Sequence, residues 1–254
     1  MKISIITIVY NNSECIEDCI NSVLKQTYPN VEYIIIDGGS KDNTVEIINK
    51  YKDKISYFIS EKDNGLYDAL NKGIEAATGD IIGILHSDDL FFNNDTLSNI
   101  VSAFEKSKAD LVYAKGQYVE RSNTNLVKRI YPSKPFRKRY LYFGWIPLHT
   151  TIYVKKEIFD NYGKYQTNYK IASDYEISLR WFFNDKIKKI FLNDWVVKMR
   201  LGGKSTTISL QKLKSNEDLK IISKYNLLGY FTLFCKIARK IPQYLIPTIF
   251  RINS

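Results

Sequence analysis

The sequence has few cysteines and no apolar run of the length that crosses a membrane. Its three cysteines, Cys15, Cys19 and Cys235, are an odd number without the C-x-x-C spacing of zinc or redox motifs. A disulfide miniprotein is therefore disfavoured, and a reduced, cytosolic chain is the simplest interpretation. We find no internal repeat and no low-complexity linker, which also disfavours a repeat array.

The composition is that of an ordinary folded domain. Of 254 residues, 44% are hydrophobic and 25% are charged, which separates the chain from disordered sequences. The length fits one large domain, or one domain with an appendage. The first residues, MKISIITIVYNN, lack the small-residue cleavage site of a signal peptide, so they are better interpreted as a buried first strand.

Charge is distributed unevenly along the chain. Residues 1–100 carry 8 basic and 16 acidic side chains, a net charge of −8, whereas residues 101–254 carry 29 and 11, a net charge of +18. The acidic half could hold a metal ion. The basic half could meet an anionic surface, a phosphate-bearing substrate or nucleic acid, and a simple solvated lysine-rich surface is the alternative.

Apolar, β-branched runs alternate with amphipathic stretches over the first 90 residues. This alternation is typical of parallel strands covered by helices on both faces, and it predicts a doubly wound α/β sheet. We expect strands over 2–10, 31–37, 55–60 and 80–86, and helices beginning at Ser13, Asp42, near Tyr67 and at Asn94 or Asp95.

The pattern loosens after a strand at 111–116. We expect a strand over 150–154, a helix over 172–183, a strand or hairpin over 188–200 and a polar amphipathic helix over 208–225. The last stretch, 227–250, is apolar with cations at Lys236, Arg239, Lys240 and, just beyond it, Arg251. Its longest uncharged run is too short to span a membrane. An interfacial helix on anionic lipid and a helix packed on the protein's own core both fit.

Carboxylates follow three successive strands of the predicted sheet. Asp37 follows the second strand, Asp63 and Asp68 follow the third, and the pair Asp88 and Asp89 follows the fourth. Ligands of open α/β sheets bind at these strand ends. Adjacent carboxylates there suit Mg²⁺ or Mn²⁺ that also holds substrate phosphates, whereas a turn or helix cap is the structural alternative.

Several sequence blocks together resemble glycosyltransferase family 2, in its bacterial subgroup that builds capsule, O-antigen and exopolysaccharide. The resemblance spans residues 1–200 and keeps the order and spacing of the blocks. They are ITIVYNN (6–12), SVLKQTY (22–28), IIIDGGSKDNT (34–44), DNGLYDALNKGI (63–74), ATGDIIGILHSDD (77–89) and ASDYEISLRW (172–181).

The resemblance implies a GT-A fold, a Rossmann-like, mostly parallel α/β sheet with helices on both faces, followed by C-terminal amphipathic helices. It implies a GT-A domain over 1–205, with a nucleotide-sugar half at 1–110 and an acceptor half at 111–205. Residues 206–254 would form a helical, membrane-associating extension. The implied reaction is inverting transfer of a hexose or N-acetylhexosamine from a UDP-linked sugar, with a divalent cation, Mg²⁺ or Mn²⁺.

Residue by residue, the resemblance places the donor at the first four strand ends. Asp37 would accept from the uracil imide N–H, and Asp88 and Asp89 would grip the metal ion, with His86 in place of the first Asp of the family's D-x-D element. The further residues implied to bind the nucleotide sugar are Thr7, Val9, Tyr10, Asp63, Asp68 and Lys72.

On the acceptor side, Asp174 matches the family's general base, with Ser173 in place of the usual Glu before it. Partial burial that raises its pKa would suit this role. His149 matches a histidine common in the subgroup, near the acceptor or diphosphate. The loop GGKS (202–205) is not a P-loop, because Lys198 stands where a P-loop needs its first glycine. We interpret it as a flexible loop that closes over the donor, in which Lys204 would touch phosphate.

Residues 128–147 combine cations with aromatic side chains. This mixture suits a lipid pyrophosphate and, equally, single-stranded nucleic acid or a solvated loop. Its position in the acceptor half favours a polyprenyl-diphosphate-linked acceptor, and no nucleic acid is expected. The members are Lys128, Arg129, Lys134, Arg137, Lys138 and Arg139, with Tyr131, Phe136, Tyr140, Tyr142 and Trp145.

The leading hypothesis is therefore a sugar transferase that is peripheral on the inner face of the cell membrane. It would transfer the sugar to a saccharide or lipid-linked saccharide during surface polysaccharide synthesis. The alternatives are an inactive nucleotide-binding docking module and a nucleic-acid binder. The sequence leaves open the donor sugar, the acceptor, the linkage, the metal ion and the oligomeric state.

Overall fold

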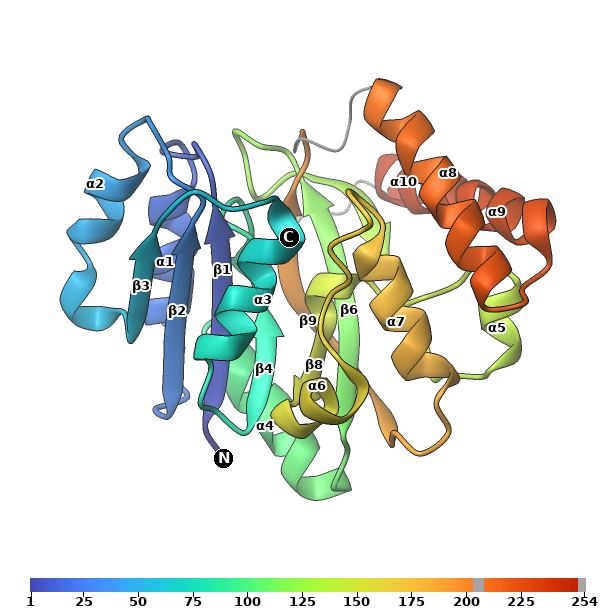
Figure 1. Ribbon diagram of the computed structural model, residues 1–254, viewed down its shortest axis with the longest axis horizontal. Coiled ribbons are helices and arrows are strands. Elements are labelled where there is room, and N and C mark those ends of the chain that lie inside the picture. The colour runs from blue at the N-terminus through green and yellow to red at the C-terminus, as the bar shows by residue number, and fades with distance from the viewer. Residues whose placement is uncertain (203–207, 251–254) are drawn as a thin grey trace.

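The structure is a computed structural model that describes residues 1–202 and 208–250 (Figure 1). A mixed sheet crosses the molecule and carries helices on both faces. In chain order the elements are β1 (Ile3–Val9), α1 (Ile16–Leu24), β2 (Val31–Asp37), α2 (Thr44–Asn49), η1 (Lys52–Lys54), β3 (Tyr57–Ser60), α3 (Leu66–Ala76), β4 (Ile81–Ile84), β5 (Leu90–Phe91), α4 (Thr96–Ser107), β6 (Leu111–Val119), β7 (Val127–Tyr131), α5 (Arg139–Tyr142), η2 (His149–Thr151), β8 (Ile152–Lys155), α6 (Lys156–Tyr162), α7 (Ser173–Phe183), β9 (Lys189–Arg200), α8 (Ile208–Lys224), α9 (Gly229–Ala238) and α10 (Lys240–Phe250).

The sheet has a parallel half and a mixed half. Its order is β3-β2-β1-β4-β8-β6-β9-β5, with β7 paired to β6. Strands β3, β2, β1 and β4 are parallel to one another, as the alternating pattern predicts. Beyond β4 the sheet is mixed, because β8 runs antiparallel to both β4 and β6 while β6 and β9 are parallel.

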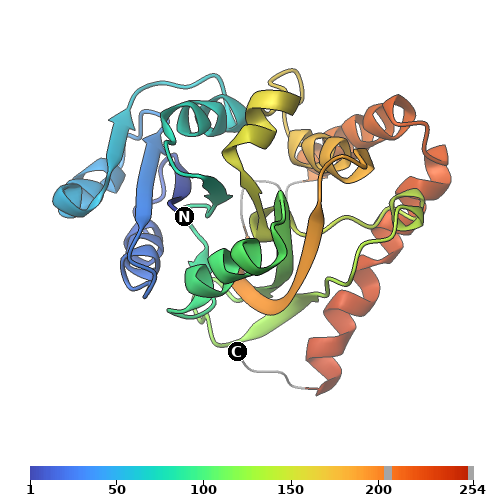
Figure 2. The same cartoon turned by 90° about the horizontal axis from the view of Figure 1, so that it is seen from below.

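Alternate residues of each strand supply two separate cores. In β1, Ile3 and Ile5 pack with α1, α2 and α4, whereas Ile6 and Ile8 pack on the opposite face with α3, α6 and α7. Figure 2 shows helices on both sides of the sheet. Full burial of both faces explains why these strands are almost wholly apolar in sequence.

Several predicted boundaries change. Helix α1 begins at Ile16 rather than Ser13, and the Ser13 N–H donates to the Asp42 carboxylate at 3.1 Å. Residues 188–200 form the single strand β9 and not a hairpin. The stretch that follows residue 116 contains strand β7 and helix α5, which the sequence pattern did not reveal.

The C-terminal helices are joined to the rest of the fold. Ile221 and Ile222 of α8 are fully buried in the same core as α7. The buried Glu217 of α8 accepts three backbone N–H groups, from Lys170, Ile171 and Ala172, at 2.8–3.0 Å. Within residues 1–202 and 208–250, no helix is long and apolar enough to cross a membrane.

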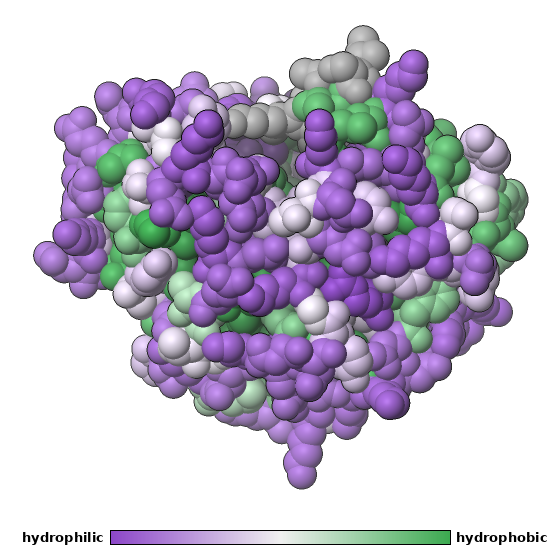
Figure 3. Space-filling model, viewed as in Figure 1, coloured by the Kyte–Doolittle hydropathy of each residue, from purple (hydrophilic) through white to green (hydrophobic). Residues whose placement is uncertain are grey.

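Helices α9 and α10 nevertheless expose large apolar side chains. They recur every three or four residues and are 42–79% exposed. In the space-filling view, hydrophobic side chains gather at the right-hand edge, over α9 (Figure 3). We call this surface the apolar C-terminal face: Leu228, Tyr230, Phe231, Phe234, Ile237, Ile241, Tyr244, Leu245 and Ile249.

Candidate active site

The end of β2 forms a rigid turn beside the end of β1. The Asp37 carboxylate is fully buried and accepts N–H groups from Gly39 and Ser40, at 3.1 and 3.0 Å, as well as the hydroxyls of Ser40 and Ser60. Two of these four bonds satisfy backbone N–H groups that would otherwise lack a partner in the turn. Asp37 therefore shapes the turn, and its contact with a nucleobase stays a prediction.

Tyr10, Gly38 and Asp63 meet above that turn. A Cβ at Gly38 would lie 2.4 Å from an Asp63 carboxylate oxygen and 3.4 Å from the Tyr10 ring, so only glycine lets these side chains close over the backbone. Tyr10 is 47% exposed. An exposed ring beside a carboxylate suits stacking on a base and accepting from its N–H groups.

Thr7 and Val9 do not reach this surface. Thr7 is fully buried and accepts a hydrogen bond from the Tyr33 hydroxyl at 3.2 Å, and Val9 belongs to the core. Their side chains therefore do not reach a nucleotide, and a contact through the backbone of this strand end stays a prediction. A strand with both faces covered directs every side chain into a core until it ends, and here the first open position is Tyr10.

Asp68 and Lys72 lie one turn apart on α3, near the same edge. Lys72 forms ion pairs with Glu61 at 2.6 Å and with Asp68 at 3.7 Å, while Asp68 also accepts the Asn64 N–H. Both side chains remain about a quarter exposed. Their predicted contact with the nucleotide or diphosphate stays a prediction.

The adjacent carboxylates Asp88 and Asp89 diverge. Asp88 is 23% exposed and lies 3.7 Å from the Arg121 guanidinium. Asp89 is 1% exposed, accepts only the Arg200 backbone N–H, and burial together with Asp88 raises its pKa well above the usual range. The second carboxylate oxygen of Asp89, Oδ2, is buried and has no hydrogen-bond partner among the described residues. The prediction that both carboxylates grip a metal ion therefore stays a prediction.

Arg121 connects the two halves of the site, and no motif in the sequence pointed to it. It follows β6, and its guanidinium donates to Glu14 at 3.1 Å and to Asn12 at 3.3 Å, as well as facing Asp88. The Asn12 amide in turn donates to Ser87 at 2.9 Å. The loops after β1, β4 and β6 therefore form one polar network, with a guanidinium suited to phosphate.

Asp174 lies in the first turn of α7, with a donor near each carboxylate oxygen. The Tyr67 hydroxyl donates to one oxygen at 3.3 Å, and His149 Nδ1 lies 3.6 Å from the other. Burial raises the pKa of Asp174, but Lys214, His149 and Lys236 together lower it, and the net pKa is lowered. The expectation of a raised pKa is therefore wrong, and the carboxylate is ionised at neutral pH.

His86 and His149 contact each other at the centre of the site. Their Nε2 atoms are 2.9 Å apart, although 63 residues separate them in sequence. Burial lowers the pKa of both rings, that of His149 to about 4. His149 thus links Asp174 to the strand end that carries His86 and Asp88. The sequence analysis placed that strand end and Asp174 in opposite halves of the domain.

A family model and curated relatives match most of the chain. The model for Glycosyl transferase family 2 matches residues 4–189. The chain belongs to glycosyltransferase family 2. It is 30% identical to a PGL/p-HBAD biosynthesis glycosyltransferase of Mycobacterium tuberculosis, over 81% of this chain and 79% of that protein. It is also 30% identical to an uncharacterized glycosyltransferase of Rickettsia typhi, over 85% and 70% of the two chains.

Solved structures share the GT-A fold of this glycosyltransferase. S. aureus TarS 1–349 in complex with UDP-GlcNAc has a TM-score of 0.70 at 20% identity, over 93% of this chain and 70% of that one. The mannosyltransferase PcManGT from Pyrobaculum calidifontis, in complex with GDP-Man and Mn²⁺, has a TM-score of 0.65 at 18% identity, over 88% and 63%. This glycosyltransferase spans 40% of the longer TarS chain.

A divalent cation fits this glycosyltransferase only in company with a donor diphosphate. Within the described ranges, no group of three His, Cys, Asp or Glu side chains is placed to hold a metal ion. Asp88 is the partly exposed carboxylate of the D-x-D position. Because Mg²⁺ is commonly bound through one or two carboxylates plus substrate phosphates, Asp88 suits such a shared site.

The predicted basic and aromatic cluster of 128–147 divides into buried and exposed members in this glycosyltransferase. Lys128, Arg137, Lys138 and Arg139 are exposed, and their contact with a lipid pyrophosphate stays a prediction. Trp145 is 1% exposed and packs against Tyr113 and Phe182, so its predicted contact with an acceptor is wrong. Arg129 is buried, lies over the Tyr118 ring and donates to Gln243 of α10. The aromatic rings fill the core that a chain of this size must build. Lys204 lies outside the described residues.

Proposed function

We propose that this family 2 glycosyltransferase is an inverting enzyme that uses a UDP-linked hexose or N-acetylhexosamine. Its acceptor would be a saccharide or lipid-linked saccharide in surface polysaccharide synthesis. The observation that carries the proposal is the Asp174 carboxylate, ionised, held between Tyr67 and His149, and linked through His86 to the strand end that bears Asp88. A base and a donor-phosphate region thus adjoin in one site.

On the donor side, Tyr10 and Asp63 over Gly38 would hold the base, and Arg121 beside Asp88 would meet the diphosphate. A divalent cation held at Asp88 between the donor phosphates would neutralise charge on the departing diphosphate. Complexes of the structural neighbours with UDP-GlcNAc and with GDP-Man support a nucleotide-sugar donor. UDP is preferred here because the resemblance to the family implies a donor that is usually UDP-linked.

In the transfer step, the acceptor hydroxyl oxygen attacks the anomeric carbon while the bond from that carbon to the donor phosphate oxygen breaks. Asp174 receives the hydroxyl proton, and the nucleotide diphosphate leaves with the bonding electron pair. Tyr67 keeps its own proton, because burial and the Asp174 charge raise its pKa, and it serves as a donor to the carboxylate. A single displacement of this kind inverts the anomeric centre.

We further propose that the apolar C-terminal face docks on an anionic membrane surface. Its side chains are exposed at helical spacing on α9 and α10. Residues 226–254 contain no Asp or Glu, and Lys240 is an exposed cation at the junction of the two helices. Apolar side chains flanked by cations alone match an interface of acyl chains and anionic headgroups.

The donor proposal is tested by thermal shift with UDP, GDP, CMP, dTDP and their sugar conjugates, with and without Mn²⁺, because a ligand of the native state raises its melting temperature. We expect the UDP series to stabilise the protein, and the selected UDP-sugar then to be turned over. UDP stabilisation without any turnover would instead support an inactive docking module. Affinity for oligonucleotides that falls steeply with salt would support a nucleic-acid binder.

The membrane proposal is tested by sedimentation with vesicles of phosphatidylcholine alone or with phosphatidylglycerol. We expect binding to the anionic vesicles only, and its loss in the triple variant Phe234→Ser, Ile241→Ser, Ile249→Ser. Tyr57→Ser, at an exposed aromatic residue on the distant edge strand β3, is the control. Equal binding of the triple variant would refute this docking face.

A further inference from the structure

The two histidines of the whole sequence are in direct contact, and this contact constrains where their protons lie. His86 follows β4 and His149 begins η2, and their Nε2 atoms are 2.9 Å apart. A nitrogen–nitrogen contact of this length requires one N–H and one lone pair. One ring must therefore carry its proton on Nε2, and the other must not.

The surroundings of His149 keep its ring neutral. Burial lowers the pKa of His149, Asp174 raises it, and His86 and Lys214 lower it further, to about 4. At neutral pH the His149 ring thus has one N–H and one acceptor nitrogen. Because the two Nε2 atoms are in contact, His149 either accepts at Nε2 and carries its proton on Nδ1, or donates from Nε2 and has a lone pair on Nδ1.

Asp174 decides between the two pairings. His149 Nδ1 lies 3.6 Å from Asp174 Oδ2, which is ionised and can only accept. A lone pair on Nδ1 would face the carboxylate lone pairs and repel them, whereas an N–H is attracted to them. The favoured arrangement is His86 Nε2–H donating to His149 Nε2, with His149 Nδ1–H directed at Asp174.

We propose that His149 is a positioning residue for Asp174 and that His86 fixes the tautomer of His149. This inference rests on the proposed role of Asp174 as the base. Tyr67 donates to Oδ1 and His149 is directed at Oδ2, so the carboxylate plane is held from both sides. The 3.6 Å separation exceeds a hydrogen bond, and contacts of this kind often tighten only when substrate binds.

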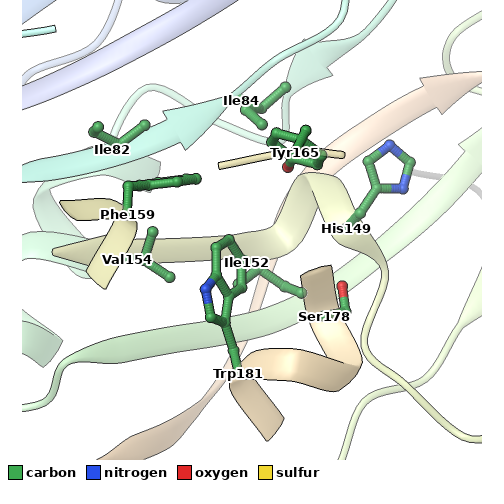
Figure 4. Close-up of a pocket in the computed structure, with 9 residues that line it drawn as sticks. All are labelled: Ile82, Ile84, His149, Ile152, Val154, Phe159, Tyr165, Ser178 and Trp181. Carbon is green, nitrogen blue, oxygen red and sulfur yellow. The ribbon is translucent and has the colours of Figure 1, made fainter. Parts of the chain in front are cut away.

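Packing holds the His149 ring in this orientation. The ring lies at one end of a cavity of about 10 Å³ whose other walls include Ile82, Ile152 and Trp181 (Figure 4). A space of this size holds about one water molecule at most. Tyr165 and Ser178 also line this cavity, whereas the ring nitrogens of His149 face His86 and Asp174.

The tautomers can be measured directly by long-range ¹H–¹⁵N NMR on the full chain labelled with ¹⁵N-histidine, at pH 7 with EDTA. With two rings, four nitrogen signals are expected, and His86→Gln and His149→Gln assign them. We expect Nε2–H for His86 and Nδ1–H for His149, and loss of the His149 preference in Asp174→Ala. Both rings as Nε2–H, or a doubly protonated ring, would overturn the proposal.

The positioning role is tested by hydrolysis of UDP-glucose, UDP-galactose and their N-acetyl forms, with water as acceptor. We expect His149→Leu to lower kcat by about tenfold to a hundredfold at unchanged donor KM, as misplaced catalytic groups do. His149→Asn, which keeps an N–H near the Nδ1 position, should restore most of the rate. Melting temperatures check that both variants fold.

Asp174→Asn is measured in parallel, so that a failure of the proposed base can be distinguished from a failure of the positioning role. Full activity of Asp174→Asn would refute Asp174 as the base, whatever His149 does. An inactive Asp174→Asn with a fully active His149→Leu would refute the positioning role alone. A raised donor KM in His149→Leu would also count against positioning and would indicate a direct donor contact.

Discussion

The two halves of this glycosyltransferase build their parts of the site in different ways. In the parallel half, Tyr10, Gly38, Asp63 and Asp88 all lie just beyond strand ends at one edge of the sheet. In the mixed half, the contributing residues depend on contacts between distant segments, such as Tyr67 with Asp174 and His86 with His149. Regular topology thus makes the donor side readable from sequence, whereas the acceptor side depends on tertiary packing.

This comparison predicts that binding and chemistry can be separated by single substitutions. Asp174→Asn should lower the transfer rate by about 10²- to 10⁴-fold, the usual contribution of a general base, with donor affinity unchanged. Initial rates and calorimetric titration with the donor measure the two effects. Asp160→Asn, on the exposed side of α6, is the matched control. A large loss of donor affinity in Asp174→Asn would contradict the assignment of donor binding and catalysis to different halves.

The reciprocal substitution is Gly38→Val. The added side chain would collide with the Asp63 carboxylate, which lies 2.4 Å from the position of its Cβ, and would displace Tyr10 as well. Because these two side chains are the ones proposed to hold the base, donor affinity should fall roughly tenfold to a hundredfold, which corresponds to a binding loss of about 1–3 kcal/mol. The rate at saturating donor should change little. A variant with normal affinity and a slow rate would contradict the proposed base-binding site.

The mixed half should also depend on α8 for its stability. Glu217→Gln replaces a carboxylate that accepts three N–H groups by an amide with one acceptor oxygen, which leaves donors unpaired. We expect a loss of about 1–3 kcal/mol, visible as a lower midpoint in chemical denaturation. Glu46→Gln, at an exposed site on α2, should have no effect.

The smallest effect is a pH dependence from His149. Its pKa is about 4 in the folded protein against an ordinary value of 6.5, so between these pH values the unfolded chain binds more protons. This contribution to stability is fully present above pH 6.5 and is lost as the pH falls toward 4. Denaturation midpoints of His149→Gln should therefore vary less with pH over this window than those of the native sequence.

The sequence predicted the donor half well and the acceptor half poorly. Apolar strand patterns placed β1, β2 and β4, and with them the turn at Asp37 and the strand end at Asp88. The sequence could not show that Thr7 points inward or that Asp89 is buried. The direction in which a side chain points depends on the strand register, and its burial depends on which elements cover the strand. Trp145 was misjudged because an aromatic residue among cations fits both a core and a surface.

Glu217 has a practical consequence for anyone who recombines enzymes of this family. Just before Asp174, the Ala172 N–H donates to Glu217 of α8. At the far end of α8, Lys224 and Tyr225 donate to Glu176 of α7. A chimaera that exchanges the acceptor half but ends before α8 would separate these partners. The segment to exchange therefore extends through Tyr225. A junction placed there should preserve the first turn of α7, which carries Asp174, as it is in the enzyme that supplies the segment.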